Sequence, residues 1–266
     1  MYRISPIVKN LLIINVLLFL ATYMLGMQFN FDLTRLLALY YPGSDYFQPY
    51  QFITYMFMHG GVAHIFFNMY LLWLFGTAIE NAWGGKRFLF YYLFTGIGAA
   101  VLHMLVNYFI HSNMEAAITT FTHAPSPELF KQFVEAHKGY FNQNVYDFIH
   151  QWSMTPDNSG YVATALENMH RVYQTGINIP TVGASGAVFG ILLAFGMMYP
   201  NTRLMLLIPP IPIKAKWLVI GYGALELFLG FAQPGSNIAH FAHLGGMLFG
   251  YILIRYWMLQ SRRQRY

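Results

Sequence analysis

The stretch TVGASGAVFGILLAFGMMYP, Thr181 to Pro200, decides how this chain folds. It contains no charged residue, and its length matches the roughly 20 apolar residues that a helix needs to cross the hydrocarbon core of a bilayer. Near its start a single hydroxyl, Ser185, lies between Gly183 and Gly186. The stretch therefore predicts a membrane helix that presents an uncovered serine close to one of its ends.

The composition of the whole chain indicates an integral membrane protein. Of its 266 residues, 56% are hydrophobic and 9% are charged, whereas roughly a quarter of the residues in a soluble domain are charged. The formal net charge is +5, but Lys and Arg are scattered along an apolar chain, so we expect the lipid bilayer and no nucleic acid as a partner. The chain has no cysteine, which excludes disulfides, thiolate nucleophiles and cysteine-bound metals.

Six apolar stretches predict an all-α polytopic membrane protein, a bundle of six transmembrane helices. They are residues 10–26, 61–82, 88–110, 182–200, 215–232 and 238–259. Arg3 and Lys9 precede the first stretch as in a signal peptide, but no small-residue cleavage site follows it, so we interpret it as a retained span. Most of the 15 Lys and Arg residues lie at the termini and in the links after spans two and four, which predicts that both termini are cytoplasmic.

Polar side chains are expected to gather at one depth below the outer surface. In this orientation the second, fourth and sixth spans all start at the outer face. The polar side chains in or near their first turns are His64, Asn68, Ser185 and His243. His64 and Asn68 are four residues apart, so they project from one face of their helix. Because ionisable groups inside a membrane are costly, they are functional candidates by default.

Glycines predict that the fourth and sixth spans touch. In AHLGGMLFG, Gly246 and Gly250 follow His243 on one helical stripe, and Gly186 lies beside the serine in the fourth span. Where side chains are missing, backbones approach closely, which would bring Ser185 within reach of His243. A histidine that accepts a serine proton is the minimum needed for an activated hydroxyl nucleophile.

Each of these residues also has a plainer interpretation. A lone serine between glycines is usually packing material, and a lone His64 or Asn68 is a hydrogen-bonding group between helices. The sequence is not the GxSxG elbow of soluble hydrolases, because Ala187 occupies the position of the last glycine. Glu226 is the only acid deep in a span, and we interpret it as a structural hydrogen-bonding group rather than one that orients a histidine.

Three motifs together resemble the rhomboid family of intramembrane serine proteases. They are HGGVAHIFFNMYLLWLFGTAIE in the second span, GASG at the start of the fourth and AHLGGMLFG in the sixth. The resemblance implies a single rhomboid-like membrane domain over residues 1–266, with a water-filled cavity open to the outside. It also implies a Ser–His dyad that lacks an acid, and it implies no cofactor and no metal.

The resemblance assigns roles residue by residue. Ser185 matches the family nucleophile and His243 its general base. His64 and Asn68 match the pair that stabilises the oxyanion, and Gly183 matches the glycine that precedes the nucleophile in that oxyanion site. The implied substrates are transmembrane proteins, single-pass ones in particular, cut in or near the outer part of their membrane segment. The implied location is multi-pass in a prokaryotic cell (inner) membrane, with the active site opening to the extracytoplasmic side.

Two features depart from the family pattern. Tyr50 and Gln51 stand where the family often has Trp-Arg in the first outer loop. Residues 111–181 form a much longer extracytoplasmic loop insertion between spans three and four than the resemblance leads one to expect. Within it, SPELFKQFVEAH, VYDFIHQW and YVATALENMHRVY have amphipathic patterns, so we expect two or three short helices near the mouth of the cavity.

Two other functions remain open at this stage. A metal- or haem-binding membrane protein would account for the histidines in the outer half, which are His59, His64, His103, His240 and His243. Against a zinc site, the chain has no HExxH motif and no evident carboxylate partner. The second alternative is an inactive rhomboid-like protein that binds membrane clients. Such proteins lack the dyad, whereas Ser185 and His243 are both present here.

Overall fold

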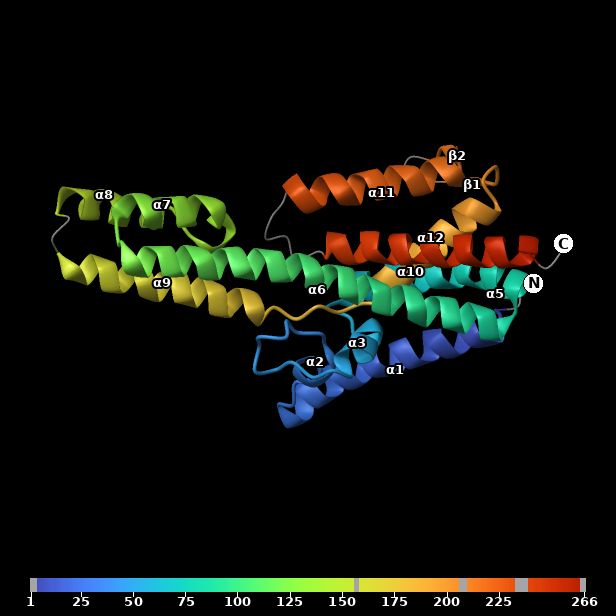
Figure 1. Ribbon diagram of the computed structural model, residues 1–266. Helices are drawn as coiled ribbons and strands as arrows, with labels where there is room; N and C mark the ends of the chain where they lie inside the picture. The colour runs from blue at the N-terminus through green and yellow to red at the C-terminus, as the bar shows by residue number, and fades with distance from the viewer. Residues whose placement is uncertain (1–3, 156–157, 206–209, 233–238, 264–266) are drawn as a thin grey trace.

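The computed structural model describes residues 4–155, 158–205, 210–232 and 239–263. One part, which we call the helix bundle, consists of apolar helical segments (Figure 1). They are α1 (Pro6–Phe29), α4 (Val62–Leu71) with the π-helical turn η2 (Leu72–Gly76) and α5 (Thr77–Trp83), the first part of α6 (Gly85–His123), α10 (Ser185–Met198), α11 (Ala215–Ala232) and α12 (His240–Arg263).

Among the described residues, four helical segments are long and apolar enough to cross a membrane. They are Pro6–Phe29, Val62–Trp83, Gly85–His123 and Ala215–Ala232, which agree with predicted spans one, two, three and five. The first helix begins, and α12 ends, at the same end of the molecule (Figure 1). That arrangement is the one expected if both termini lie on one side of a membrane; the count of six spans and the cytoplasmic side stay predictions.

α10 is shorter than its sequence pattern suggested. It has 14 residues instead of covering 182–200, and Ser185 is its first residue. At 1.5 Å per residue it is about 21 Å long, less than the roughly 30 Å of a hydrocarbon core. At least one end of α10 must therefore lie below the membrane surface.

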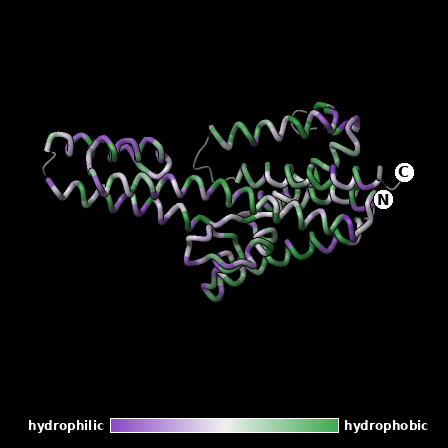
Figure 2. The backbone as a smooth tube through the Cα atoms, viewed as in Figure 1, coloured by the Kyte–Doolittle hydropathy of each residue, from purple (hydrophilic) through white to green (hydrophobic). Residues whose placement is uncertain are grey.

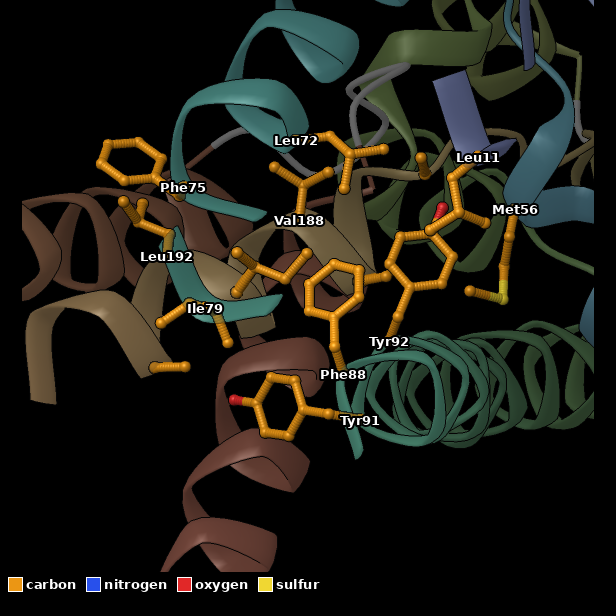
Figure 3. Packing of buried hydrophobic residues seen from close by; sticks show 14 of the residues in the cluster. Leu11, Met56, Leu72, Phe75, Ile79, Phe88, Tyr91, Tyr92, Val188 and Leu192 are labelled. Carbon is orange, nitrogen blue, oxygen red and sulfur yellow. The ribbon is translucent and has the colours of Figure 1, made fainter. Parts of the chain in front are cut away.

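Missing side chains bring α10, α12 and α6 into backbone contact. A Cβ on Gly246 of α12 would overlap the carbonyl oxygen of Gly186, and one on Gly245 would lie 2.9 Å from Ala99 Cα in α6. The predicted close approach of the fourth and sixth spans is thus confirmed. Around these contacts, larger side chains such as Tyr91 and Val188 fill the core of the bundle (Figure 3).

The segment expected to be a long loop is largely helical. α6 continues past residue 110 to His123, because the sequence there has no glycine or proline to end it. Its 39 residues are about 58 Å long, far more than a bilayer core requires. α6 therefore runs through the expected start of the loop at 111 and ends inside the 111–181 segment.

The amphipathic segments, expected to form two or three short helices, form three helices. They are α7 (Pro127–Ala136), α8 (Asn144–Met154) and α9 (Ser159–Ile177), with a short η3 (Lys138–Tyr140) between the first two. Together with the end of α6 they form what we call the appended module, residues 111–177, at the end opposite the termini (Figure 1). It has its own core, which includes Phe121, Phe130, Phe133, Trp152 and Met169. Hydrophilic and hydrophobic residues are mixed in the module, whereas the bundle is mainly hydrophobic (Figure 2).

Short elements lie between these helices in the described part of the chain. α2 (Leu33–Leu37), α3 (Gln51–Thr54) and η1 (Tyr55–Phe57) lie in the first loop, and β1 (Arg203–Met205) pairs with β2 (Pro212–Lys214) in an antiparallel hairpin that the sequence pattern did not predict. The Gln51 amide anchors the first loop: it donates to the carbonyls of Leu36 (3.2 Å) and Tyr46 (2.8 Å) and accepts from two further backbone N–H groups. The first loop is thus anchored by Gln51, although the Trp-Arg pair that the family often has is absent at Tyr50-Gln51.

Candidate active site

The turn before α10 positions Ser185. Gly183 has φ +127°, a backbone conformation that side chains disfavour. A Cβ there would also lie 2.8 Å from Nε2 of His64 and 3.5 Å from Oγ of Ser185, so His64 and Ser185 both border the space that the glycine leaves free. The N–H of Gly183 donates to the Tyr55 carbonyl at 3.0 Å. Gly183 therefore contributes space and backbone shape, and its own amide is occupied.

Ser185 and His243 are brought together from two helices. Oγ of Ser185 lies 2.8 Å from Nε2 of His243, a hydrogen-bonding distance. The His243 ring stacks on Phe189, with ring centroids 4.3 Å apart and planes 4° from parallel. Phe189 is four residues after Ser185, so both project from the same face of α10. Its role in holding the histidine was missed, although its spacing from Ser185 was a usable signal.

His64 and Asn68 lie on α4, beside the same turn. Asn68 is buried, and its Nδ2 finds no hydrogen-bond partner among the described residues. A buried amide donor without an acceptor is costly in a native structure. The ring of His64 packs edge-on against His59, 5.1 Å between centroids. The structure thus places His64 next to Ser185 and leaves a donor of Asn68 unused.

Glu226 is closer to the histidines than its sequence context indicated. Its Oε2 lies 2.6 Å from Nδ1 of His240, a buried hydrogen bond that fits the expected structural role. The same oxygen lies 3.0 Å from Nδ1 of His243, although the N–H direction there is not aligned as a hydrogen bond. The expectation that these histidines have no carboxylate partner is therefore wrong. Depth along α11 was readable from sequence, but the direction in which Glu226 points was not.

Glu226, His240 and His243 also form a group that can hold a metal ion. Their ligand atoms all lie within 4.8 Å of one another. The other histidines of the metal alternative have different neighbours: Nε2 of His103, for instance, is 3.0 Å from Oγ1 of Thr181. A metal ion in this group would bind Nδ1 of His243, which lies near Glu226, because Nε2 contacts Ser185.

A cavity of about 650 Å³ lies between the bundle and the appended module. His103, Thr181 and His240 line it from the bundle side, and Phe133 and His137 line it from the module. Through His240 it reaches the Glu226 cluster. Ser185, His243, His64 and Asn68 are not among its lining residues in the described part of the chain, so the expected location of the module near the mouth of the active site stays a prediction.

A protein-family model matches two parts of the chain. The family model for the Rhomboid domain matches residues 46–117 and 140–260. Residues 118–139, the end of α6 and α7, lie between the two matched parts. Every motif on which the resemblance was based, and every candidate site residue, lies within the matched parts.

Individual relatives carry rhomboid names. The chain is 33% identical over 202 residues, 76% of its length, to "Rhomboid protease GluP" of Bacillus subtilis. It is 31% identical over 86 residues, 32% of its length, to "Rhomboid protein 1, mitochondrial" of Saccharomyces cerevisiae. It is 39% identical over 57 residues, 21% of its length, to "Rhomboid-like protein 11, chloroplastic" of Arabidopsis thaliana. The aligned parts span only 25%, 25% and 20% of these relatives, respectively.

Proposed function

The chain belongs to the rhomboid family, and from this premise we propose that it is an intramembrane serine endopeptidase that uses Ser185 and His243. It is an integral multi-pass membrane protein, as its family and its apolar helices indicate. The observation that carries the proposal is the 2.8 Å contact between Oγ of Ser185 and Nε2 of His243.

The proposed reaction proceeds in two halves. Ser185 attacks the carbonyl carbon of the scissile peptide bond while His243 takes the serine proton on Nε2. His243 then gives that proton to the leaving nitrogen, and an acyl-enzyme forms. Water, activated by the same histidine, releases the second product and regenerates the serine.

The negative oxygen that develops on the substrate carbonyl needs donors at the start of α10. The first N–H groups of any α-helix have no partner within the helix, and the helix dipole adds positive potential at that end. We assign the remaining donors to the side chains of His64 and Asn68, since the Asn68 amide is buried and unused. One oxyanion donor is typically worth roughly 3–4 kcal/mol in the transition state.

The substrates in this proposal are transmembrane proteins, and single-pass proteins are the simplest case. A regular helix satisfies its own carbonyl groups, so a substrate segment must unwind locally before Ser185 can attack it. We place the active site toward the extracytoplasmic side of a prokaryotic cell membrane. In that orientation the appended module lies outside the membrane, where it restricts or guides substrates.

The experiment uses a panel of single-pass substrates in proteoliposomes, with fragments identified by mass spectrometry. Ser185→Ala and His243→Ala should each lower cleavage at least about a thousandfold, and the double variant should be no worse than either, because groups acting as one unit are lost together. Thermal unfolding should stay close to wild type. Full cleavage by either single variant would contradict the proposal, as would additive effects.

A second candidate function is metal binding by Glu226, His240 and His243, which their mutual proximity favours. Metal analysis of protein purified without chelators tests it directly. A stoichiometric ion that disappears in His240→Ala would support it. An inactive, client-binding role is tested by labelling with a fluorophosphonate, which reacts with activated serines: an unlabelled but folded protein would favour that role.

A further inference from the structure

The carboxylate of Glu226 lies between two histidines of the neighbouring helix. Its Oε2 is 2.6 Å from Nδ1 of His240 and 3.0 Å from Nδ1 of His243. The two histidines are three residues apart, so they lie on the same face of α12, the face that meets α11. Glu226 is 8% exposed and His240 4% exposed, so water competes little for these contacts.

The contact with Ser185 determines where His243 must keep its own proton. For Ser185 to donate to Nε2, a neutral His243 must carry its hydrogen on Nδ1. Nδ1 is buried and has no aligned acceptor among the described residues. The Glu226 oxygen is within hydrogen-bonding distance of it, and catalytic hydrogen bonds often tighten when substrate binds.

We propose that Glu226 is a positioning residue of the catalytic histidine, so that the site works as Ser185–His243–Glu226. This inference rests on the proposed protease function. The carboxylate holds His243 in the tautomer with hydrogen on Nδ1, and it stabilises the imidazolium that forms when the serine proton arrives. The serine proton moves to Nε2 and then to the leaving nitrogen, while the Nδ1 proton stays on His243 and Glu226 stays ionised.

His240 does not contact Ser185, but it holds Glu226 in place. Its hydrogen bond fixes the oxygen of Glu226 that faces His243, since both histidines contact Oε2. The bond also joins α11 to the first turn of α12. A purely structural role for Glu226 would consist of this link alone, so the test must separate the link from an effect on His243.

Glu80 provides a matched control. It is also a buried glutamate, 4% exposed, and its carboxylate accepts the N–H groups of Ile7 (3.0 Å) and Val8 (2.8 Å). It thereby links α5 to α1, and no catalytic group is among its hydrogen-bond partners in the described part of the chain. Glu80→Gln removes a buried carboxylate of the same kind without touching the proposed site.

The kinetic test measures kcat and KM for one transmembrane substrate in proteoliposomes. Glu226→Gln should lower kcat about 10- to 100-fold with KM within about twofold, because orientation and charge compensation matter mostly once the proton has moved. Glu226→Asp keeps the charge and should recover part of kcat. Glu80→Gln should lower the unfolding temperature and leave kcat within about twofold. An unchanged kcat in Glu226→Gln, or an equal loss in Glu80→Gln, would overturn the role of Glu226.

Two further measurements keep this inference separate from the protease proposal. If Ser185→Ala and His243→Ala abolish cleavage while Glu226→Gln keeps full kcat, the dyad stands and the third member is rejected. If Ser185→Ala still cleaves, the protease proposal itself fails. Should Glu226→Gln not fold, Glu226→Asp decides: kcat below wild type with KM and the unfolding temperature near wild type supports the positioning role, and kcat equal to wild type overturns it.

Discussion

Gly186 and Gly246 bring two helices of the bundle into backbone contact, whereas the appended module places Phe130 and Trp152 between its helices. The bundle needs the close contact because lipid is as apolar as a leucine side chain, so burial in a membrane favours packing and polar contacts rather than apolar area. The module has amphipathic helices whose apolar faces gain stability by leaving water. The difference indicates that the bundle sets the 2.8 Å geometry of the site, while the module can change without altering the chemistry.

The largest expected effect comes from breaking the close contact in the bundle. In Gly246→Ala the new methyl group would overlap the carbonyl oxygen of Gly186, so α10 and α12 must separate. We expect at least a hundredfold loss of cleavage and a destabilisation of about 1–3 kcal/mol, as for an overpacked core. Substrate cleavage and thermal unfolding measure it.

The control for that variant is Gly221→Ala on α11. A Cβ at Gly221 meets nothing within 4 Å, so activity and unfolding temperature should stay near wild type. Wild-type activity in Gly246→Ala would show that the helix contact does not set the site.

Truncating a large side chain in the core of the module should unfold the module and leave the candidate active site intact. Trp152 is 1% exposed, and its replacement by alanine should cost about 3–5 kcal/mol locally. Limited proteolysis should then cut within residues 111–177, while the rate of Ser185 labelling by a fluorophosphonate stays within about twofold. Met154→Ala, at a side chain 70% exposed, is the matched control. Labelling that falls together with module stability would argue that the two regions fold as one unit.

Removing the module tests its role with substrates. With residues 115–175 replaced by a short Gly/Ser linker, Ser185 should still react with a small fluorophosphonate, while cleavage of transmembrane substrates changes several-fold in rate or selectivity. The module lines one side of the cavity that reaches His240, which is the reason to expect the change. The idea that it guides substrates is wrong if both activities survive unaltered.

A smaller effect is expected from pH, which should change the stability of the module through His137. Burial lowers the pKa of His137, in the module, below its ordinary value of 6.5. The unfolded module therefore binds a proton more readily than the folded one, and its stability is highest above about pH 6.5 and declines as the pH falls below that value. Proteolysis of the module should become faster from pH 7 to pH 5 in wild type and less so in His137→Gln. An equal acceleration in both would assign the effect to another group.

The sequence was informative wherever depth or spacing decided the outcome. Depth and glycines together brought Ser185 to His243, because helix rise and close packing follow simple geometry. The helices of the module followed from amphipathic period and, for α7, from the Ser126 cap, whose side chain accepts the N–H of Leu129. Rotation of an apolar helix is a different matter: α11 is apolar on most faces, so the pattern did not reveal that Glu226 turns toward α12.

The hydropathy pattern also could not predict where a helix continues beyond its membrane span. A span ends in a hydropathy profile where polar residues begin, yet the backbone of α6 needs no apolar environment to continue to His123. The role of Phe189 also depended on the placement of its partner, since stacking requires the His243 ring from another helix.

We expect the bundle alone to create an activated serine at the start of α10. Treating wild type, His243→Ala and the linker variant with a fluorophosphonate, and mapping the adduct by mass spectrometry, tests this expectation. We predict one adduct, on Ser185, in the wild type and in the linker variant, and none above background in His243→Ala. An adduct on another serine, or labelling of Ser185 that does not depend on His243, would show that His243 does not activate Ser185.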